Sequence, residues 1–165
     1  MKNLLILIFS SLLLFSCGKT NQPKTIYIVR HAEKQLEGSD PDLLQVGKIR
    51  AAKLAQILAG KDIKHVYSTD YTRTKNTALP TAKAAGVEVE LYDPRNHDDL
   101  VEKLRTLEGN TLVVGHSNTV NQLANYFVGS GEKYADLNDI EYDFIFVVTL
   151  DASGEKVERK VYKDF

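Results

Sequence analysis

The sequence predicts an α/β fold: a three-layer α/β/α sandwich with a mostly parallel central sheet and a C-terminal hairpin. Two observations lead to this prediction. Short runs of β-branched and aromatic residues alternate with segments whose apolar residues recur at helical spacing. The end of the chain differs, because two strand-like runs follow each other across a short turn. Of the 165 residues, 43% are hydrophobic and 26% charged, a mixture typical of one globular domain.

Four strands are expected to form the parallel part of the sheet. They are 25–29 (TIYIV), 63–68 (IKHVYS), 87–92 (VEVELY) and 111–115 (TLVVG). Each is a short apolar run that contains Val, Ile or Tyr, which are residues that favour strands. A helix between successive strands would carry the chain back across the sheet, so that both faces are covered.

A helix is expected after each of these strands, because apolar residues recur three or four positions apart there. The residues that define the four helices are Ala51, Leu54, Ala55 and Leu58; then Ala78, Ala82 and Ala85; then Leu100, Leu104 and Leu107; and finally Val120, Leu123, Ala124 and Phe127. Gly86 and Gly109 are expected to end the second and third helices. The tail predicts a hairpin of 143–150 and 156–162, with the alternating second strand at an edge.

The first residues predict an export signal. Lys2 precedes an apolar run over residues 4–15, which is too short to span a bilayer comfortably. The run ends in Leu-Phe-Ser-Cys17, which resembles the bacterial lipobox, where the cysteine is lipidated and becomes the new N-terminus. We therefore expect a lipoprotein-type signal peptide over 1–17, a tether over 18–24 and a folded domain over 25–165. The alternative is an ordinary signal peptide with an incidental cysteine.

The charge and cysteine content restrict the possible partners. The formal net charge is −1, and the sequence has no basic stripe, so we expect no nucleic-acid partner. Cys17 is the single cysteine, so no disulfide can form within the chain. The partners expected are a small substrate and, through the lipid, a bacterial membrane on its periplasmic or cell-surface side.

Charged side chains follow the ends of the predicted strands. Arg30 and His31 follow the first strand, Arg73 opens the helix after the second, Asp93 follows the third and His116 the fourth. Ligands of open α/β sheets bind beyond the carboxyl ends of the strands. Arginine matches phosphate oxygens with two parallel donors, and imidazole can act as a nucleophile or base. This set suits phosphoryl chemistry.

Four ordered motifs resemble the histidine phosphatase superfamily, which includes phosphoglycerate mutases and phosphohistidine phosphatases. They are "VRHAEK", "DPDLLQVGKIRAAKLAQIL", "VYSTDYTRTKNTA" and "TLVVGHSNTV". The resemblance implies that His31 attacks phosphorus and is transiently phosphorylated. It also implies that Arg30, Arg73 and His116 bind the phosphate oxygens, where charge develops in the transition state.

The resemblance also implies a carboxylic acid that protonates the leaving oxygen. In the mutase-like branch this acid follows a strand, which here falls on Asp93. Glu33 is the main alternative, and Asp98 and Asp99 are others. No cofactor or metal is expected, because the histidines and carboxylates lack the spacing of a zinc site and two arginines would repel a cation.

The sequence therefore predicts a phosphatase that works without a metal and hydrolyses a phosphomonoester, or a phosphohistidine, through phospho-His31. The alternatives are a mutase and a non-catalytic module that binds phosphate. Segments 35–42, 93–100 and 129–139 are expected to border the site and to set its specificity.

Overall fold

The computed structural model describes residues 22–165. The predicted signal peptide, Cys17 and the first part of the tether lie outside the described residues. Within residues 22–165, no helix is both long and apolar enough to cross a membrane.

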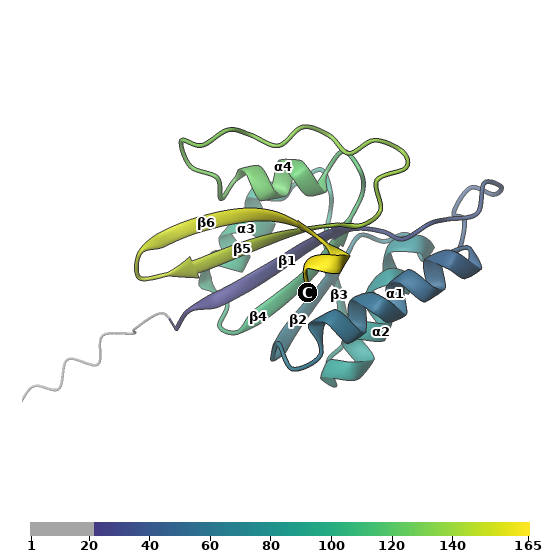
Figure 1. The fold of residues 1–165 in the computed structure, drawn as a ribbon, viewed down its shortest axis with the longest axis horizontal. Coiled ribbons are helices and arrows are strands. Elements are labelled where there is room, and N and C mark those ends of the chain that lie inside the picture. The colour runs from purple at the N-terminus through teal and green to yellow at the C-terminus, as the bar shows by residue number, and fades with distance from the viewer. Residues whose placement is uncertain (1–21) are drawn as a thin grey trace, which may run out of the picture.

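One six-stranded sheet forms the centre of the domain, as Figure 1 shows. The strands are β1 (Lys24–Arg30), β2 (Ile63–Ser68), β3 (Val89–Leu91), β4 (Asn110–Gly115), β5 (Phe144–Asp151) and β6 (Gly154–Val161). Their order across the sheet is β3-β2-β4-β1-β5-β6. The first four strands pair in parallel, whereas β5 pairs antiparallel with both β1 and β6. The predicted fold class is therefore confirmed, including the C-terminal hairpin and its edge strand.

The helices form two outer layers (Figure 1). They are α1 (Gln45–Leu58), α2 (Thr72–Ala85), α3 (His97–Thr106) and α4 (Val120–Asn125), and a short 3-10 helix, η1 (Tyr162–Asp164), ends the chain. The first two helices cover one face of the sheet, and α3 and α4 cover the other.

Alternate residues of the central strands supply the two cores. In β1, Ile26 and Ile28 pack toward α3 and α4, whereas Tyr27 and Val29 pack toward α1 and α2. Successive side chains of a strand point to opposite faces, so a strand buried on both faces is apolar throughout. Each fully buried Leu, Ile or Val side chain stabilises the fold by roughly 1.5–3 kcal/mol relative to an exposed one.

Three elements are shorter than the sequence pattern predicts. The third strand covers only Val89–Leu91 of the expected 87–92. Helix α3 ends at Thr106, and the short α4 ends before Phe127, which is nevertheless fully buried. Apolar periodicity marks the residues that face the core. Because a residue just after the end of a helix can still be buried, the observed helices are shorter than the periodicity predicts.

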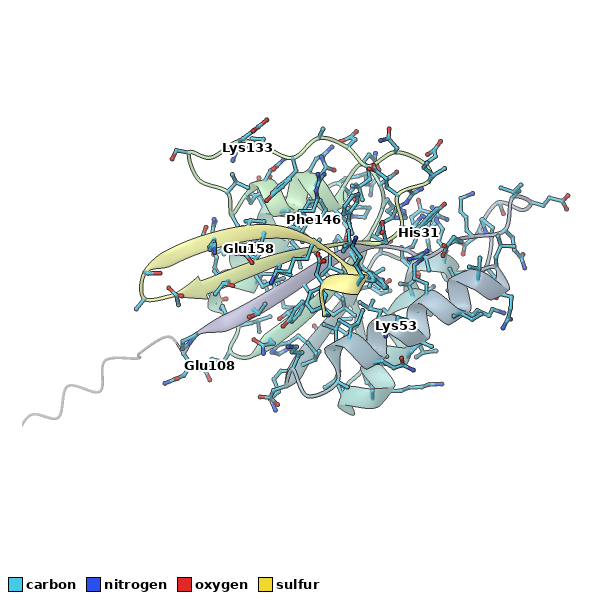
Figure 2. The ribbon with its side chains drawn as sticks, viewed as in Figure 1. His31, Lys53, Glu108, Lys133, Phe146 and Glu158 are labelled. Atoms are coloured by element: carbon cyan, nitrogen blue, oxygen red, sulfur yellow. The ribbon has the colours of Figure 1, made fainter. Side chains whose placement is uncertain are left out.

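The register of the parallel strands brings their carboxyl ends together. Arg30 at the end of β1 lies opposite Gly115 at the end of β4, and Ser68 at the end of β2 lies opposite Val114. Beyond the sheet, the His31 amide donates to the Gly115 carbonyl at 2.9 Å. In Figure 2, His31 lies where β1 leaves the sheet. Residues that follow three different strands therefore meet at one edge.

Candidate active site

A pocket of about 560 Å³ opens at this edge of the sheet. Arg30, His31, Arg73 and His116 all line it. The four residues that the sequence assigned to nucleophilic attack and phosphate binding thus lie in one cavity. The fifth predicted site residue, Asp93, does not line it, although its neighbours Pro94 and Arg95 do.

The imidazole of His31 is buried and held in one orientation. Its Nδ1 lies 2.8 Å from the Ala32 carbonyl oxygen, which can only accept, so Nδ1 carries the proton and Nε2 keeps its lone pair. Burial lowers the pKa of His31 to about 3, and nearby His116, Arg30 and Arg73 act in the same direction against the raising effect of the Ala32 carbonyl. At neutral pH the ring is therefore uncharged, which is the state that a nucleophile requires.

His116 is held by two buried threonines. Its Nε2 lies 2.9 Å from Thr69 Oγ1, which lies 3.0 Å from Thr74 Oγ1, and Thr74 Oγ1 in turn is 2.9 Å from the Tyr71 carbonyl oxygen. The Tyr71 carbonyl oxygen at the end of this series of hydrogen bonds can only accept, so the Thr74 hydroxyl donates to it. The Thr69 hydroxyl then donates to Thr74, and His116 Nε2–H donates to Thr69. His116 Nδ1 is then the nitrogen left for other partners.

The ring of His116 is also uncharged at neutral pH. Burial, together with the positive charges of Arg73 and Arg30, lowers its pKa to about 4. The two imidazoles pack edge to face, with ring centroids 5.6 Å apart. An anion bound beside the two imidazoles would raise the pKa of His116, because a nearby negative charge favours the protonated ring. His116 can therefore gain a proton when an anion binds.

Arg30 is fixed by the segment that precedes β5. Its Nη1 donates to the carbonyls of Asn138 at 2.8 Å and Asp139 at 3.2 Å, and its guanidinium lies over the Tyr142 ring at 4.1 Å. The side chain is only 6% exposed. Its Nε is buried and has no hydrogen-bond partner within the described part of the chain.

Arg73 lies in the first turn of α2, with its guanidinium 4.4 Å from the centre of the Tyr71 ring. Its Nη1 is 3.6 Å from a carboxylate oxygen of Asp40, which also accepts from the Thr72 amide and hydroxyl. Like that of Arg30, its Nε is buried without a partner among residues 22–165. A buried donor without an acceptor is costly, so an anion that accepts from both Nε atoms would be stabilised here.

Close backbone contacts hold these groups together. Thr77 of α2 accepts from the Ala32 amide at 2.9 Å and donates to the Arg73 carbonyl at 2.7 Å, which ties the end of β1 to the start of α2. A methyl group at Gly115 would lie 2.7 Å from the Tyr92 hydroxyl and 3.0 Å from Val120 Cγ1. A side chain at the end of β4 would therefore have to displace the Tyr92 side chain.

The structure places the expected proton donors outside the pocket. Arg95 pairs with Asp93 through two contacts of 3.0 and 2.9 Å, and these hydrogen bonds lower the pKa of Asp93 to about 2. Glu33 accepts a bidentate pair from Arg50, with a shortest contact of 2.6 Å. Carboxylates held in this way are ionised at neutral pH and cannot donate a proton. Nothing in these contacts supports either as the acid.

The two remaining candidates are also bonded elsewhere. Asp98 accepts from the Tyr126 hydroxyl at 2.7 Å, and Asp99 accepts from the Asn96 side-chain amide at 2.6 Å. Both lie in the first turn of α3, where acidic residues favour the helix N-terminus. Neither lines the pocket.

Several residues of the site carry no strong sequence signal. Thr69 and Thr74 stand inside the quoted motif "VYSTDYTRTKNTA", but only the structure shows that both are buried, that Thr69 contacts His116 and that Thr74 contacts Thr69. Lys34 and Asp139 also line the pocket. Lys34 directly follows the "RHAE" stretch, and Asp139 belongs to the segment 129–139 that was expected to border the site.

The sandwich thus gathers two uncharged imidazoles and two guanidinium groups beyond its strands, an arrangement suited to binding a phosphoryl group. The sequence model of the histidine phosphatase superfamily (branch 1) matches residues 26–102. Over these residues, which make up a little under half of the chain, the sequence is similar to the histidine phosphatase superfamily.

Curated relatives include proteins named "Probable phosphoglycerate mutase GpmB". The protein of Escherichia fergusonii is 33% identical over 107 residues, which are 61% of this chain and 49% of the relative. That of an Escherichia coli O1:K1 strain is 30% identical over 125 residues, or 69% of this chain and 58% of the relative. This chain therefore spans about half the length of the curated relatives that it matches.

Solved structures of similar fold include two phosphatases. The protein histidine phosphatase SixA, complexed with tungstate, has a TM-score of 0.70 at 18% identity, and the match covers 85% of this chain and 98% of SixA. A mycobacterial glucosyl-3-phosphoglycerate phosphatase has a TM-score of 0.64 at 10% identity, with 85% and 98% covered. At these identities the likeness establishes the fold.

Proposed function

We propose that this protein is a phosphatase that works without a metal and hydrolyses a phosphate monoester through phosphorylated His31. A phosphohistidine is the second substrate class. The observation that carries the proposal is the combination of an uncharged His31, whose Nε2 lone pair is available, with two buried guanidinium Nε atoms that lack partners among the described residues. A phosphate would accept from both arginines.

In the first step, His31 Nε2 attacks phosphorus while the bond from phosphorus to the leaving group breaks. The leaving group takes a proton and departs, and His31 carries the phosphoryl group. In the second step, water attacks the same phosphorus, the N–P bond breaks and inorganic phosphate leaves. Arg30, Arg73 and a protonated His116 stabilise the charge on the phosphoryl oxygens in both steps.

The access of solvent to the pocket supports hydrolysis over mutase activity, in which the phosphoryl group moves to another position of the substrate. The pocket is open to solvent and reaches the surface beside Lys34, Arg95 and Asp139. A mutase must shield its phosphoenzyme from water, because water competes with the acceptor. The likeness to the SixA complex with tungstate, an oxyanion of phosphate-like shape, is in keeping with an oxyanion site in this fold.

The test is phosphate release from p-nitrophenyl phosphate by the full chain, purified in a mild detergent, with and without a chelator. We expect turnover that the chelator leaves unchanged, and none in His31→Ala, which should still bind tungstate. As a control, His65→Ala removes a histidine that contacts the Glu108 carbonyl and does not line the pocket. Near-wild-type activity of His31→Ala would exclude the mechanism.

The mutase alternative is motivated by the curated relatives that carry that name. Incubation with 3-phosphoglycerate distinguishes the two activities, since a phosphatase releases inorganic phosphate and a mutase forms the 2-phospho isomer. The non-catalytic alternative predicts stoichiometric phosphate binding and no turnover of any activated ester.

We further propose that the chain is exported and held on a bacterial membrane by lipid on Cys17. The support is the sequence pattern of residues 1–17 alone. Two acyl chains add about 0.8 kcal/mol per buried CH₂, enough for stable anchoring. Labelled palmitate should enter the wild type and not Cys17→Ala, and equal labelling of both would contradict the anchor.

A further inference from the structure

The leaving group of an alkyl phosphate needs a proton, and the residues expected to supply it are engaged elsewhere. Glu33, Asp93, Asp98 and Asp99 are each hydrogen-bonded to another side chain, and none of the four lines the pocket. Among the Asp and Glu residues in the described part of the chain, Asp139 alone lines the pocket that contains His31. The acidic residue that lines the pocket therefore comes from the segment between α4 and β5.

The main chain around Asp139 is tied to both halves of the phosphate site. The Asp139 carbonyl accepts from Arg30 Nη1 at 3.2 Å, which places its backbone beside the cation next to His31. Two positions earlier, the Leu137 amide donates to the Ser117 carbonyl at 3.0 Å, directly after His116. Asp139 is therefore positioned by contacts to residues adjoining both histidines.

A local turn fixes the same segment. The Glu141 carboxylate accepts from the Asn138 amide at 2.6 Å, and the Glu141 amide donates to the Asn138 carbonyl at 3.0 Å. Tyr142 then places its ring over the Arg30 guanidinium. These contacts use the backbone around Asp139 and the carboxylate of Glu141, and none of the hydrogen bonds or ion pairs found in residues 22–165 uses the Asp139 carboxylate.

We propose that Asp139 is the proton donor for the leaving group. As the bond from phosphorus to oxygen breaks, the Asp139 carboxyl gives its proton to that oxygen, so that an alcohol leaves and a carboxylate remains. In the second step the carboxylate takes a proton from the water that attacks phospho-His31, which restores the starting state.

This inference rests on the proposed phosphatase activity and adds a residue to it. Its test compares wild type, Asp139→Asn and Asp93→Asn on a series of phosphate esters. The series runs from p-nitrophenyl phosphate, whose leaving group needs little protonation, through phenyl phosphate to an alkyl phosphate. Asp93→Asn is the matched control, because the same change is made to a carboxylate outside the pocket.

We expect Asp139→Asn to lose little activity on p-nitrophenyl phosphate and about 10²–10⁴-fold on the alkyl ester, the range over which general acids act. Asp93→Asn should show no such dependence on the leaving group. Tungstate binding by Asp139→Asn, measured by calorimetry, checks that the phosphate site is intact.

The outcomes separate the two proposals. If the wild type is active, His31→Ala is inactive and Asp139→Asn loses the same factor on every ester or nothing at all, the proton-donor assignment is wrong and the phosphatase stands. If the wild type hydrolyses none of the esters, both proposals fail for this substrate class.

Discussion

The groups at the strand ends and the carboxylates on the connecting segments are held in different ways. His31 is 4% exposed, Arg30 is 6% exposed, and Gly115 beside them is fixed by the register of β1 and β4. Asp93 and Asp40, in contrast, lie on exposed connections and bond to neighbouring side chains or to a helix N-terminus. A sheet buried on both faces allows one register, whereas an exposed carboxylate bonds to the nearest suitable donor.

The two regions also differ in charge. Burial and nearby cations keep the pKa values of His31 and His116 well below the ordinary value of 6.5, so both rings stay uncharged. Hydrogen bonds from Arg95 and Arg50 keep the pKa values of Asp93 and Glu33 low, so both carboxylates stay ionised. The strand ends thus present uncharged imidazoles, whereas the connecting segments carry Asp93 and Glu33 as ionised carboxylates.

Among the variants that test this comparison, the largest effect is expected at Arg73, in the first turn of α2. Arg73→Met removes a buried donor of the phosphate site and should lower kcat/KM about 10²–10³-fold, the usual cost of losing one transition-state donor. Arg105→Met is the matched control, because Arg105 pairs with Glu155 away from the pocket. The measurement is steady-state kinetics on p-nitrophenyl phosphate. A loss of less than threefold in kcat/KM for Arg73→Met would contradict the view that the buried cations of the site contribute more to catalysis than the exposed connecting segments.

A smaller effect is expected at the threonine that positions His116. Thr69→Val keeps the side-chain volume but removes the acceptor of the His116 Nε2 proton. A hydrogen bond to a charged group contributes about 1.5 kcal/mol or more, so kcat should fall about tenfold. Thr81→Val is the control: Thr81 is buried and its hydroxyl has no partner within residues 22–165. Equal activities of the two variants would show that the hydroxyl chain does not position the ring.

The stability of the protein should depend on pH through the buried histidines. Their folded-state pKa values, about 3 for His31 and about 4 for His116, lie below the unfolded value of 6.5. Between these limits the unfolded state binds more protons, so the free energy of unfolding falls as pH decreases from 6.5 toward 3. Above pH 6.5 this contribution is constant.

Urea unfolding of wild type and His31→Asn over pH 4–7.5 measures the contribution of His31. The advantage of the wild type over the variant should shrink as the pH falls below 6.5. A difference that stays constant across this range would mean that His31 is not held uncharged by the fold.

The smallest effect is expected at the sequence-predicted acid. Asp93→Asn removes a carboxylate that is ionised, bonded to Arg95 and outside the pocket, so kcat/KM on the alkyl phosphate should change less than twofold. A loss of 100-fold or more, measured beside Asp139→Asn, would return the proton-donor assignment to Asp93.

Much of the site could be predicted because it follows directly from strand ends. The apolar runs that end at Val29 and Val114 place Arg30, His31 and His116 beyond parallel strands, and such residues share one edge in any open α/β sheet. Arg73 follows β2 by one short turn and is equally constrained. In each case the position depends on periodicity and chain direction, both of which can be read locally.

The proton donor could not be predicted in this way. Asp93 directly follows "VEVELY", but the strand is short and Arg95, two residues later, takes its carboxylate. Asp139 lies more than 100 residues from His31 and reaches the pocket because Arg30 and Ser117 bind its segment. No local pattern encodes these distant contacts.

The sequence by itself determined the layer architecture, the edge of the sheet that holds the site and the four groups suited to bind and attack a phosphate. Alternation, helical spacing and strand ends are local features, and burial enforces them. The tertiary structure decided which carboxylates are paired, which nitrogen of each histidine is free and which acidic residue lines the pocket. Those properties depend on distances between residues far apart in the chain, which are set only when the layers pack.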